Sequence, residues 1–376
     1  MHIGIFGLSN SGKTTVFNAS TRGNAEVASY VGGLILPNIG TVKVPDERLE
    51  KLSKIYLPKK TVPAEVTYTD VPGLTKGMSS GNDQQAQTQI FTHLRNAEAL
   101  LHVVRAFEDE NVSHPDDSVD PIRDIDTAEI EFMIADLGII EKRLKRIDRD
   151  IRKLSGTDRD RVRIEEQTLR WFQELLESET PLRAVEMSDD QEKVTRGYRF
   201  LSQKPQLILF NVGEENREDE RKLIEMAHEK FQTSGQIPGK IPSRMASAIC
   251  GKLEMELAQM EEEDAALFMD DLGIDEPGLN KMIRLSYRLL GVCSFFTVGA
   301  DEVRAWTISE NTPAQKAAGE IHSDLERGFI RAEVIRYQDH IKYGSIVEAK
   351  KRGVVRLEGK DYIVRDGDIM NIRFNV

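Results

Sequence analysis

Cysteine and long apolar runs are scarce in this chain of 376 residues, and its 51 Lys and Arg are outnumbered by 63 Asp and Glu. Its two cysteines, Cys250 and Cys293, exclude a disulfide framework, and their spacing matches no zinc motif. No apolar run approaches the roughly 20 residues that span a bilayer, and the N-terminus lacks the basic and apolar regions of a signal peptide. We therefore expect a reduced, cytoplasmic protein with no membrane contact.

The formal net charge of −12 excludes a surface broadly adapted to nucleic acid, because such a surface needs clustered Lys and Arg opposite the phosphates. Any RNA contact must be local, and no DNA partner is expected. A composition of 39% hydrophobic and 30% charged residues is typical of a folded protein. The length suffices for two or three domains of about 100–150 residues each.

A phosphate-binding loop is present near the N-terminus. Residues 7–14 read Gly-Leu-Ser-Asn-Ser-Gly-Lys-Thr, which fits G-x-x-x-x-G-K-[ST], between an apolar run at 3–6 and a helix-compatible segment at 14–19. Glycines let backbone N–H groups approach phosphate oxygens at a helix N-terminus. Lys13 is expected to bind the β and γ phosphates, and Thr14 to ligate Mg²⁺. The residues predicted to bind nucleotide here are Asn10, Ser11, Gly12, Lys13, Thr14 and Thr15.

A switch-like motif, Asp-Val-Pro-Gly at residues 70–73, follows the extended stretch 64–69. Asp70 is predicted to hold Mg²⁺ through a water molecule, and Gly73 to face the γ-phosphate. GTPases usually continue with a glutamine that orients water, but Leu74 occupies that place, and leucine neither donates to water nor accepts from it. Hydrolysis must therefore use another group.

A candidate base-binding motif, Asn-Val-Gly-Glu at residues 211–214, follows the apolar run 207–210. A guanine-specific protein would carry N-K-x-D there, and its Asp would accept hydrogen bonds from the guanine edge. Here the Lys is absent and Glu214 is one methylene longer, which disfavours guanine and favours adenine. Asn211, Val212 and Glu214 are the predicted base-site residues, although an ordinary polar loop would have the same sequence.

The apolar runs 100–104 and 207–210 are typical of buried parallel strands, so an α/β sheet is predicted. Between them lies a helical insertion whose apolar seam stops at the turn signal 155–157 and resumes through Leu169, Phe172 and Leu176. An antiparallel helical hairpin projecting as an arm is predicted. The seam residues are Ile130, Met133, Leu137, Ile140, Leu144, Ile147, Ile151 and Leu154.

The arm is locally basic. Residues 142–163 carry ten Lys or Arg against four Asp, a local excess of six positive charges, which indicates an RNA-binding surface. A solvated coiled-coil face with i,i+4 pairs, such as Glu141 with Lys145, would have the same pattern.

The pattern changes from about Ser294 to short β-like runs at 354–357, 362–364 and 369–374, so a separate small domain is expected. Phe295, Phe296 and Trp306 are predicted to form its core rather than to stack on bases.

The motifs at 10–14 and 211–214, together with the runs 276–280, 302–308, 327–332 and 359–364, resemble the YchF group of Obg-like ATPases over essentially the whole chain. The resemblance implies an ATPase related to translation GTPases, with ATP preferred over GTP and a hydrophobic residue, as at Leu74, replacing the catalytic glutamine. It also implies Mg²⁺ as cofactor, with K⁺ as a second candidate cation, and a ribosome or ribosomal RNA as partner.

The fold implied is a P-loop NTPase of Ras-like G-domain type with an inserted antiparallel coiled-coil arm and a C-terminal β-rich, β-grasp-like TGS domain. The expected boundaries are 1–125 and 204–290 for the nucleotide-binding domain, 126–203 for the arm and 291–376 for the TGS domain. The arm and the TGS domain are the expected ribosome contacts.

A loop histidine is implied to take part in hydrolysis in this family, and the matching residue is His114. Imidazole can position water or transfer protons near neutral pH, although a solvated loop histidine is the alternative. Two departures alter the switches. Leu34 stands where the family has a threonine that completes the Mg²⁺ shell, and the glycine-rich segment at 78–83 differs, so the ordering of the switches by the γ-phosphate is expected to change.

Three functions follow in order of preference. The first is a slow ATPase switch that reports its nucleotide state to a ribosomal partner, in translation or in stress regulation. The second is a nucleotide-sensing scaffold with little hydrolysis, which Leu34 and Leu74 would favour. The third is an Obg-type GTPase, which the missing Lys and Asp after Asn211 disfavour.

Overall fold

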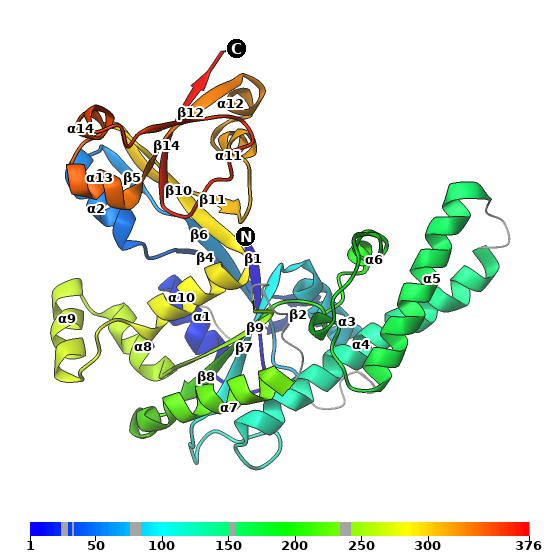
Figure 1. Cartoon of the computed structure of the whole chain (residues 1–376). Helices are drawn as coiled ribbons and strands as arrows, with labels where there is room; N and C mark the ends of the chain where they lie inside the picture. The colour runs from blue at the N-terminus through cyan, green and yellow to red at the C-terminus, as the bar shows by residue number, and fades with distance from the viewer. Residues whose placement is uncertain (24–28, 32–33, 76–83, 151–154, 234–241, 376) are drawn as a thin grey trace. The chain divides into compact units, whose positions relative to one another are not determined.

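The computed structural model describes residues 1–23, 29–31, 34–75, 84–150, 155–233 and 242–375 (Figure 1). The chain forms two compact units, one of Met1–Val42 with Thr67–Leu289 and one of Lys43–Val66 with Leu290–Val376. Across the described residues, no helix combines the length and the apolarity needed to cross a membrane.

The first unit is built on a six-stranded sheet with the order β4-β6-β1-β7-β8-β9. β1 pairs in parallel with β6 and β7, β7 with β8, and β8 with β9, which confirms the predicted parallel sheet. The strands of this sheet are β1 (His2–Phe6), β4 (Asn38–Lys43), β6 (Glu65–Asp70), β7 (Ala99–Ala106), β8 (Gln206–Val212) and β9 (Arg244–Ile249). A separate two-stranded sheet pairs β2 (Ser29–Val31) with β3 (Leu34–Leu36).

Helices connect these strands and cover the sheet. The longer ones are α1 (Lys13–Thr21), α3 (Gln84–Asn96), α4 (Pro121–Asp150), α5 (Gly156–Glu177), α7 (Glu220–Thr233), α8 (Gly251–Gln259), α9 (Glu262–Asp271) and α10 (Gly278–Leu289). The shorter ones are η2 (Leu182–Ala184), α6 (Asp189–Thr195), η3 (Arg196–Tyr198) and η4 (Glu214–Asp219).

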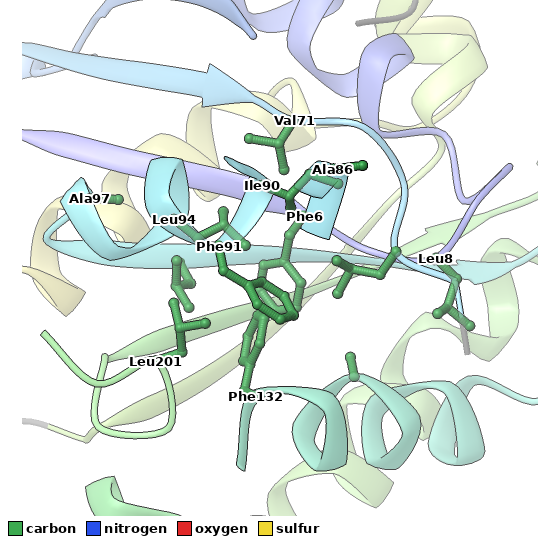
Figure 2. Close-up of a cluster of buried hydrophobic side chains, with 13 residues drawn as sticks. Phe6, Leu8, Val71, Ala86, Ile90, Phe91, Leu94, Ala97, Phe132 and Leu201 are labelled. Atoms are coloured by element: carbon green, nitrogen blue, oxygen red, sulfur yellow. The ribbon is translucent and has the colours of Figure 1, made fainter. Parts of the chain in front are cut away.

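A buried aromatic cluster joins the central strand to two helices. Figure 2 shows Phe6 of β1 beside Phe91 of α3 and Phe132 of α4. The ring centroids of Phe6 and Phe132 lie 4.8 Å apart, and those of Phe91 and Phe132 lie 5.9 Å apart with the rings edge-on. Burial of each ring stabilises the fold by roughly 1.5–3 kcal/mol. The first turns of α4 therefore belong to the core of the sheet, and only its later turns enter the arm.

α4 and α5 lie side by side and form the predicted antiparallel hairpin (Figure 1). Its buried seam combines Met133, Ile140, Leu144 and Ile147 of α4 with Leu169, Phe172 and Leu176 of α5. The predicted seam residue Ile130 differs, because its side chain is 42% exposed. Ile151 and Leu154 lie outside the described residues. Among the described residues no ion pair joins Glu141 to Lys145, whereas Arg143 Nη2 binds Glu165 Oε2 at 2.8 Å.

A buried carboxylate fastens the base of the arm to the sheet. Glu129 of α4 pairs with Arg183 of η2, at 2.6 Å, and with Arg244 of β9. Arg183 also donates to the backbone oxygens of Lys204 and Leu201, at 2.8 and 3.1 Å. One carboxylate therefore joins the outgoing helix, the returning chain and a strand of the sheet.

The second unit contains another six-stranded sheet, ordered β13-β12-β14-β10-β11-β5. Phe295 and Phe296 are both fully buried and alternate in direction along β10: Phe295 joins the core that includes α11, and Arg48 of α2 lies over the ring of Phe296. The strands are β5 (Lys60–Val62), β10 (Val292–Val298), β11 (Glu302–Ser309), β12 (Phe329–Arg336), β13 (Arg356–Glu358) and β14 (Asp368–Phe374). The helices are α2 (Glu47–Tyr56), α11 (Ala314–Ile321), α12 (Ser323–Arg327), α13 (Tyr337–Tyr343) and α14 (Ile346–Lys351).

Two details of the second unit differ from the sequence-based expectations. The segment Lys43–Val66, expected in the nucleotide-binding domain, belongs to this unit because β5 pairs with β11 and Arg48 binds Asp366 at 2.7 Å. Residues 362–364 form an isolated bridge at Ile363 rather than a strand. Trp306 packs against the core as predicted but is only partly buried, and Arg304 lies over its ring at 4.0 Å from the centroid.

Replacing Glu129 with Ala should lower the free energy of unfolding of the first unit by about 3–5 kcal/mol, because two guanidinium groups would stay buried without their carboxylate. Urea unfolding followed by Trp171 fluorescence, in a Trp306→Phe background, measures the loss. As a control, Asp190→Ala removes an exposed partner of Lys193 and should cost less than about 0.5 kcal/mol. Equal losses in the two variants would contradict the fastening role.

Candidate nucleotide-binding site

The predicted nucleotide-binding motifs meet at one edge of the first sheet. β1, β6, β7, β8 and β9 are parallel, so the loops that follow them leave from the same side. Ligands of open α/β sheets bind at this carboxyl edge. The sheet therefore brings together segments that are as much as 200 residues apart, as are Asn211 and Ser11.

The phosphate-binding loop turns sharply between β1 and α1, and its two glycines are required. Gly12 has φ +90° at the N-cap of α1, and a Cβ there would lie 2.1 Å from Asn211 Nδ2. Gly7 has φ +156°, and a Cβ there would lie 2.2 Å from the carbonyl oxygen of Val103. Asn10 also has a positive φ, of 63°. Only residues that tolerate these angles let the loop close around an anion.

Lys13 points back over the loop. Its Nζ donates to the carbonyl oxygen of Leu8 at 2.8 Å, and its side chain is almost fully buried. Burial lowers the pKa of this ammonium to about 8, and the nearby Asp70 carboxylate opposes the shift. A buried cation beside a helix N-terminus is suited to the charge of bound phosphates.

Thr14 and Asp70 meet as the switch motif predicts. The Thr14 hydroxyl donates to Asp70 Oδ2 at 2.9 Å, and Asn38 Nδ2 lies 3.5 Å from the same oxygen. Burial raises the pKa of Asp70, while the Thr14 hydrogen bond and the charge of Lys13 act in the opposite direction. Asp70 Oδ1 is buried without a hydrogen-bond partner, as is the hydroxyl oxygen of Ser11.

These oxygens fit Mg²⁺, which prefers hard oxygen ligands and keeps several waters and phosphate oxygens in its shell. Thr14 Oγ1 and the free oxygen of Asp70 supply such ligands. Nowhere in the described residues do three or more His, Cys, Asp or Glu side chains gather as a protein-only metal site. The arrangement fits a cation held jointly by the protein and a nucleotide.

The segment after Asp70 lies against the phosphate-binding loop through its backbone. Leu74 N donates to Gly7 O at 2.9 Å, and Ser9 N donates to Leu74 O at 3.2 Å. A Cβ at Gly73 would lie 2.8 Å from Ser9 Cα, so glycine alone permits this approach. The Leu74 side chain is fully buried in the cluster that contains Phe6, so it cannot contact a water at the phosphates.

Asn211 joins two loops at the base-binding end of the site. Its Nδ2 donates to Ser11 O at 3.0 Å, and its Oδ1 accepts from Gly251 N at 2.9 Å. Glu214 is exposed and pairs with Lys252 Nζ at 2.9 Å. The Val212 side chain lies in the core, so only its backbone can face a nucleotide.

His114 lies in the loop after β7 and is buried. Its Nδ1 accepts from Asp116 N at 3.1 Å, which places the proton of a neutral ring on Nε2, and Nε2 contacts Asp124 Oδ2 at 2.9 Å. The preceding residue is held by the phosphate loop, since Asn10 Nδ2 donates to Ser113 O at 3.0 Å. Both ring nitrogens are therefore engaged, and direct participation of His114 in hydrolysis stays a prediction.

The remaining predicted site residues are placed as follows. Thr15 is the third residue of α1, in its first turn, and is half-buried. Leu34 begins β3. The segment 78–83 lies outside the described residues.

Sequence reasoning missed three participants: Asn38, Gly251 and Lys252. Gly251 and Lys252 follow β9. Functional residues of parallel sheets lie just after the carboxyl ends of strands, so a prediction of β9 from the sequence would have pointed to both residues. Asn38 had no local signal, because its relation to Asp70 depends on how β4 and β6 lie in the sheet.

Gly73→Ala should weaken ATP binding at least about tenfold, because the new Cβ would push Ser9 and the phosphate-binding loop out of place. Titration with a fluorescent ATP analogue measures the affinity. Gly138→Ala in α4 is the matched control, since no atom lies within 4 Å of its Cβ position and alanine favours a helix. Unchanged affinity in Gly73→Ala would contradict the close approach.

Comparison with known proteins agrees with this architecture. Residues 2–137 match a family model described as "50S ribosome-binding GTPase", and residues 292–375 match the YchF-GTPase C-terminal model, described as "Protein of unknown function (DUF933)". The "Ribosome-binding ATPase YchF" of Bacillus subtilis is 42% identical over 99% of both chains, and that of Escherichia coli O157:H7 is 39% identical over 99% of both.

A solved structure extends the similarity to three dimensions. The structure of the "Schizosaccharomyces pombe YchF GTPase" matches with a TM-score of 0.82 at 30% identity, covering 99% of this chain and 97% of that one. Sequence and fold thus agree over the full length, including the phosphate-binding loop, the helical insertion and the C-terminal unit. This chain belongs to the YchF family of P-loop NTPases.

Proposed function

We propose that this protein binds ATP with Mg²⁺ at the carboxyl edge of the first sheet and hydrolyses it slowly, as a molecular switch that associates with the ribosome. The observation that carries this proposal is the contact of the Thr14 hydroxyl with Asp70 beneath the loop of Lys13. The names of the relatives, which describe ribosome-binding ATPases, support both the nucleotide and the partner.

The phosphates would lie against the backbone N–H groups of the loop and the ammonium of Lys13, which now binds the Leu8 carbonyl. Bound Mg²⁺ supplies charge neutralisation and orientation of the phosphates. Thr14 and Asp70 would hold it, Thr14 directly and Asp70 through a water. K⁺ is a second candidate cation, to be tested by comparing turnover in KCl and NaCl.

The water that attacks the γ-phosphate needs a positioning group, and Leu74 is removed from that role by its burial. His114 is the proposed group. Its ring would have to leave Asp124 and turn toward the phosphates, and the hydrogen bond from Asn10 to Ser113 keeps its loop beside the phosphate-binding loop. Gly73, which lies close against Ser9 of the phosphate-binding loop, would sense the γ-phosphate through its backbone.

Adenine is the proposed base because Asn211 and Glu214 lack the N-K-x-D constellation. Asn211 would shape the site by holding the loops of Ser11 and Gly251 together, and Glu214 would lie at its rim beside Lys252. The relatives' names differ on this point, since those of the bacterial proteins say ATPase and that of the yeast structure says GTPase.

The nucleotide state would reach the ribosome through the arm, residues 126–203, and through the C-terminal unit, which we assign as a TGS domain of residues 291–376. Exposed cations on the arm, among them Lys142, Lys145 and Arg146, support an RNA contact there. The proposed setting is the cytoplasm. Burial of the Leu74 side chain also favours one alternative, a nucleotide-sensing scaffold with little hydrolysis.

ATP should bind more tightly than GTP, and Lys13→Ala should lower ATP turnover at least about 100-fold, because it removes the cation that faces the β and γ phosphates. Equilibrium titration of both nucleotides and release of inorganic phosphate measure the two effects. Tighter GTP binding would overturn the adenine assignment. Wild-type turnover no faster than that of Lys13→Ala would establish the scaffold instead.

His114→Ala should lower turnover about tenfold or more while leaving ATP affinity within about twofold, because the ring would act only after the water is in place. Single-turnover phosphate release and ATP titration separate the two. Asp124→Asn is a second variant for the same measurements. Its amide keeps the size of the carboxylate but changes the group that contacts His114 Nε2. Unchanged turnover in His114→Ala would exclude the histidine from catalysis.

A further inference from the structure

A surface hollow of about 570 Å³ lies in the first unit, where the chain returns from the arm to the sheet. It is formed by α6, η3 and the segment that leads into β8. Four cationic side chains line it, Lys193, Arg196, Arg199 and Lys204. The predicted nucleotide site uses none of these residues, and they lie outside the basic stretch of the arm at 142–163.

Two of the four cations in this hollow donate to neutral oxygens rather than to carboxylates. Arg199 donates to the neutral amide oxygen of Asn96 at 2.7 Å, and Lys204 donates to the backbone oxygen of Ala97. In the described chain, no carboxylate lies within ion-pair distance of Arg196, Arg199 or Lys204. Burial is the main cause that lowers the pKa of Lys204 to about 8, and the neighbouring charge of Arg199 adds to it.

Two carboxylates also line the hollow, Asp189 and Glu192, against the four cations. Lys193 has a further exposed partner in Asp190, at 3.4 Å, which is a weak contact. Glu98 and the buried Asp136 act on Lys204 from outside the lining, but Asp136 already binds Ser202 and Arg95. The lining keeps an excess of two positive charges on a chain whose formal net charge is −12.

The hollow offers charge but no surface for stacking bases. Its one aromatic lining residue, Phe200, is fully buried. Tyr198 stacks on that ring, and its hydroxyl is bonded to Glu165. Single-stranded RNA is recognised largely by stacking on aromatic side chains, whereas structured RNA presents its phosphates and 2′-hydroxyls. A hollow with Lys and Arg but no exposed aromatic side chain therefore suits the phosphates of structured RNA.

We propose that the hollow of Lys193, Arg196, Arg199 and Lys204 binds the phosphodiester backbone of structured RNA. The inference deepens the proposed ribosome association and adds a contact surface at the base of the arm. Glu129 fastens this base to the sheet, so RNA held here would contact a part of the molecule that is joined to the nucleotide-binding sheet.

The test is the double variant Lys193→Gln with Arg196→Gln, because both side chains are exposed, whereas Arg199 and Lys204 also support the fold through Asn96 and Ala97. The probe is a fluorescein-labelled RNA hairpin of about 20 base pairs, titrated at KCl concentrations of about 50–200 mM. We expect about tenfold weaker binding at the lowest salt. The slope of log affinity against log salt should fall by about two, one for each lost phosphate contact.

The matched control is Arg221→Gln with Lys222→Gln, which removes the same charge from exposed positions on α7 and should leave the affinity and the slope unchanged. An equal loss of RNA affinity in both variants would show that only the net charge of the protein matters, and would overturn the proposal. Wild-type affinity in the hollow variant would overturn it as well. Poly-L-glutamate at equal charge concentration should displace the RNA poorly, and equal displacement would assign the hollow to an acidic protein.

Ribosome co-sedimentation and ATP turnover of the same variants separate this inference from the proposed function. If the hollow variant sediments fully with ribosomes and binds the hairpin with unchanged affinity, the hollow is not an RNA site, and the proposed ribosome association still stands. Absence of sedimentation by the wild-type protein would remove ribosome association, and the hairpin titration would still decide whether the hollow binds RNA.

Discussion

The carboxylate of Glu129 is the interaction on which the arrangement of the first unit depends. It is buried between Arg183 and Arg244, so it ties together α4, the chain that returns from the arm, and β9. A charge that stays buried without its partner costs several kcal/mol, so the pairing favours contact among these three segments. α4 also inserts Phe132 beside Phe6 of the strand that leads into the phosphate-binding loop. The arm is therefore a continuation of the core of the first unit.

The nucleotide site follows from the same sheet. Parallel strands deliver Lys13, Asp70 and Asn211 to one edge, and backbone contacts hold the loops there at close range. The burial of Leu74 has a consequence for catalysis. A leucine that completes the core stabilises the switch segment through apolar contacts, so the segment has no polar group at that position to orient a water. Whatever group performs that task must come from another loop.

Much of this could be predicted from local sequence. The phosphate-binding loop, the strands around it and the helical hairpin each carry a pattern in one continuous stretch of the chain, and each was found where expected. The predictions that were incomplete share a cause. The partnership of Asn38 with Asp70, the bridge of Asn211 to Gly251 and the pairing of β5 with β11 all join residues far apart in the chain. Periodicity and propensity contain no information about such pairs.

The sequence by itself supplied the candidate groups of the site: a glycine-framed loop with Lys13 and Thr14, an Asp at a strand end, and an Asn predicted to bind the base. These depend on residue type and spacing, which a linear chain displays. Only the tertiary structure decided the direction of the side chains. It placed Leu74 in the core, engaged both nitrogens of His114 and gathered the cations of the hollow at the base of the arm. The physical reason is that burial and ion pairing are set by which segments pack together, and packing joins segments that the sequence keeps apart.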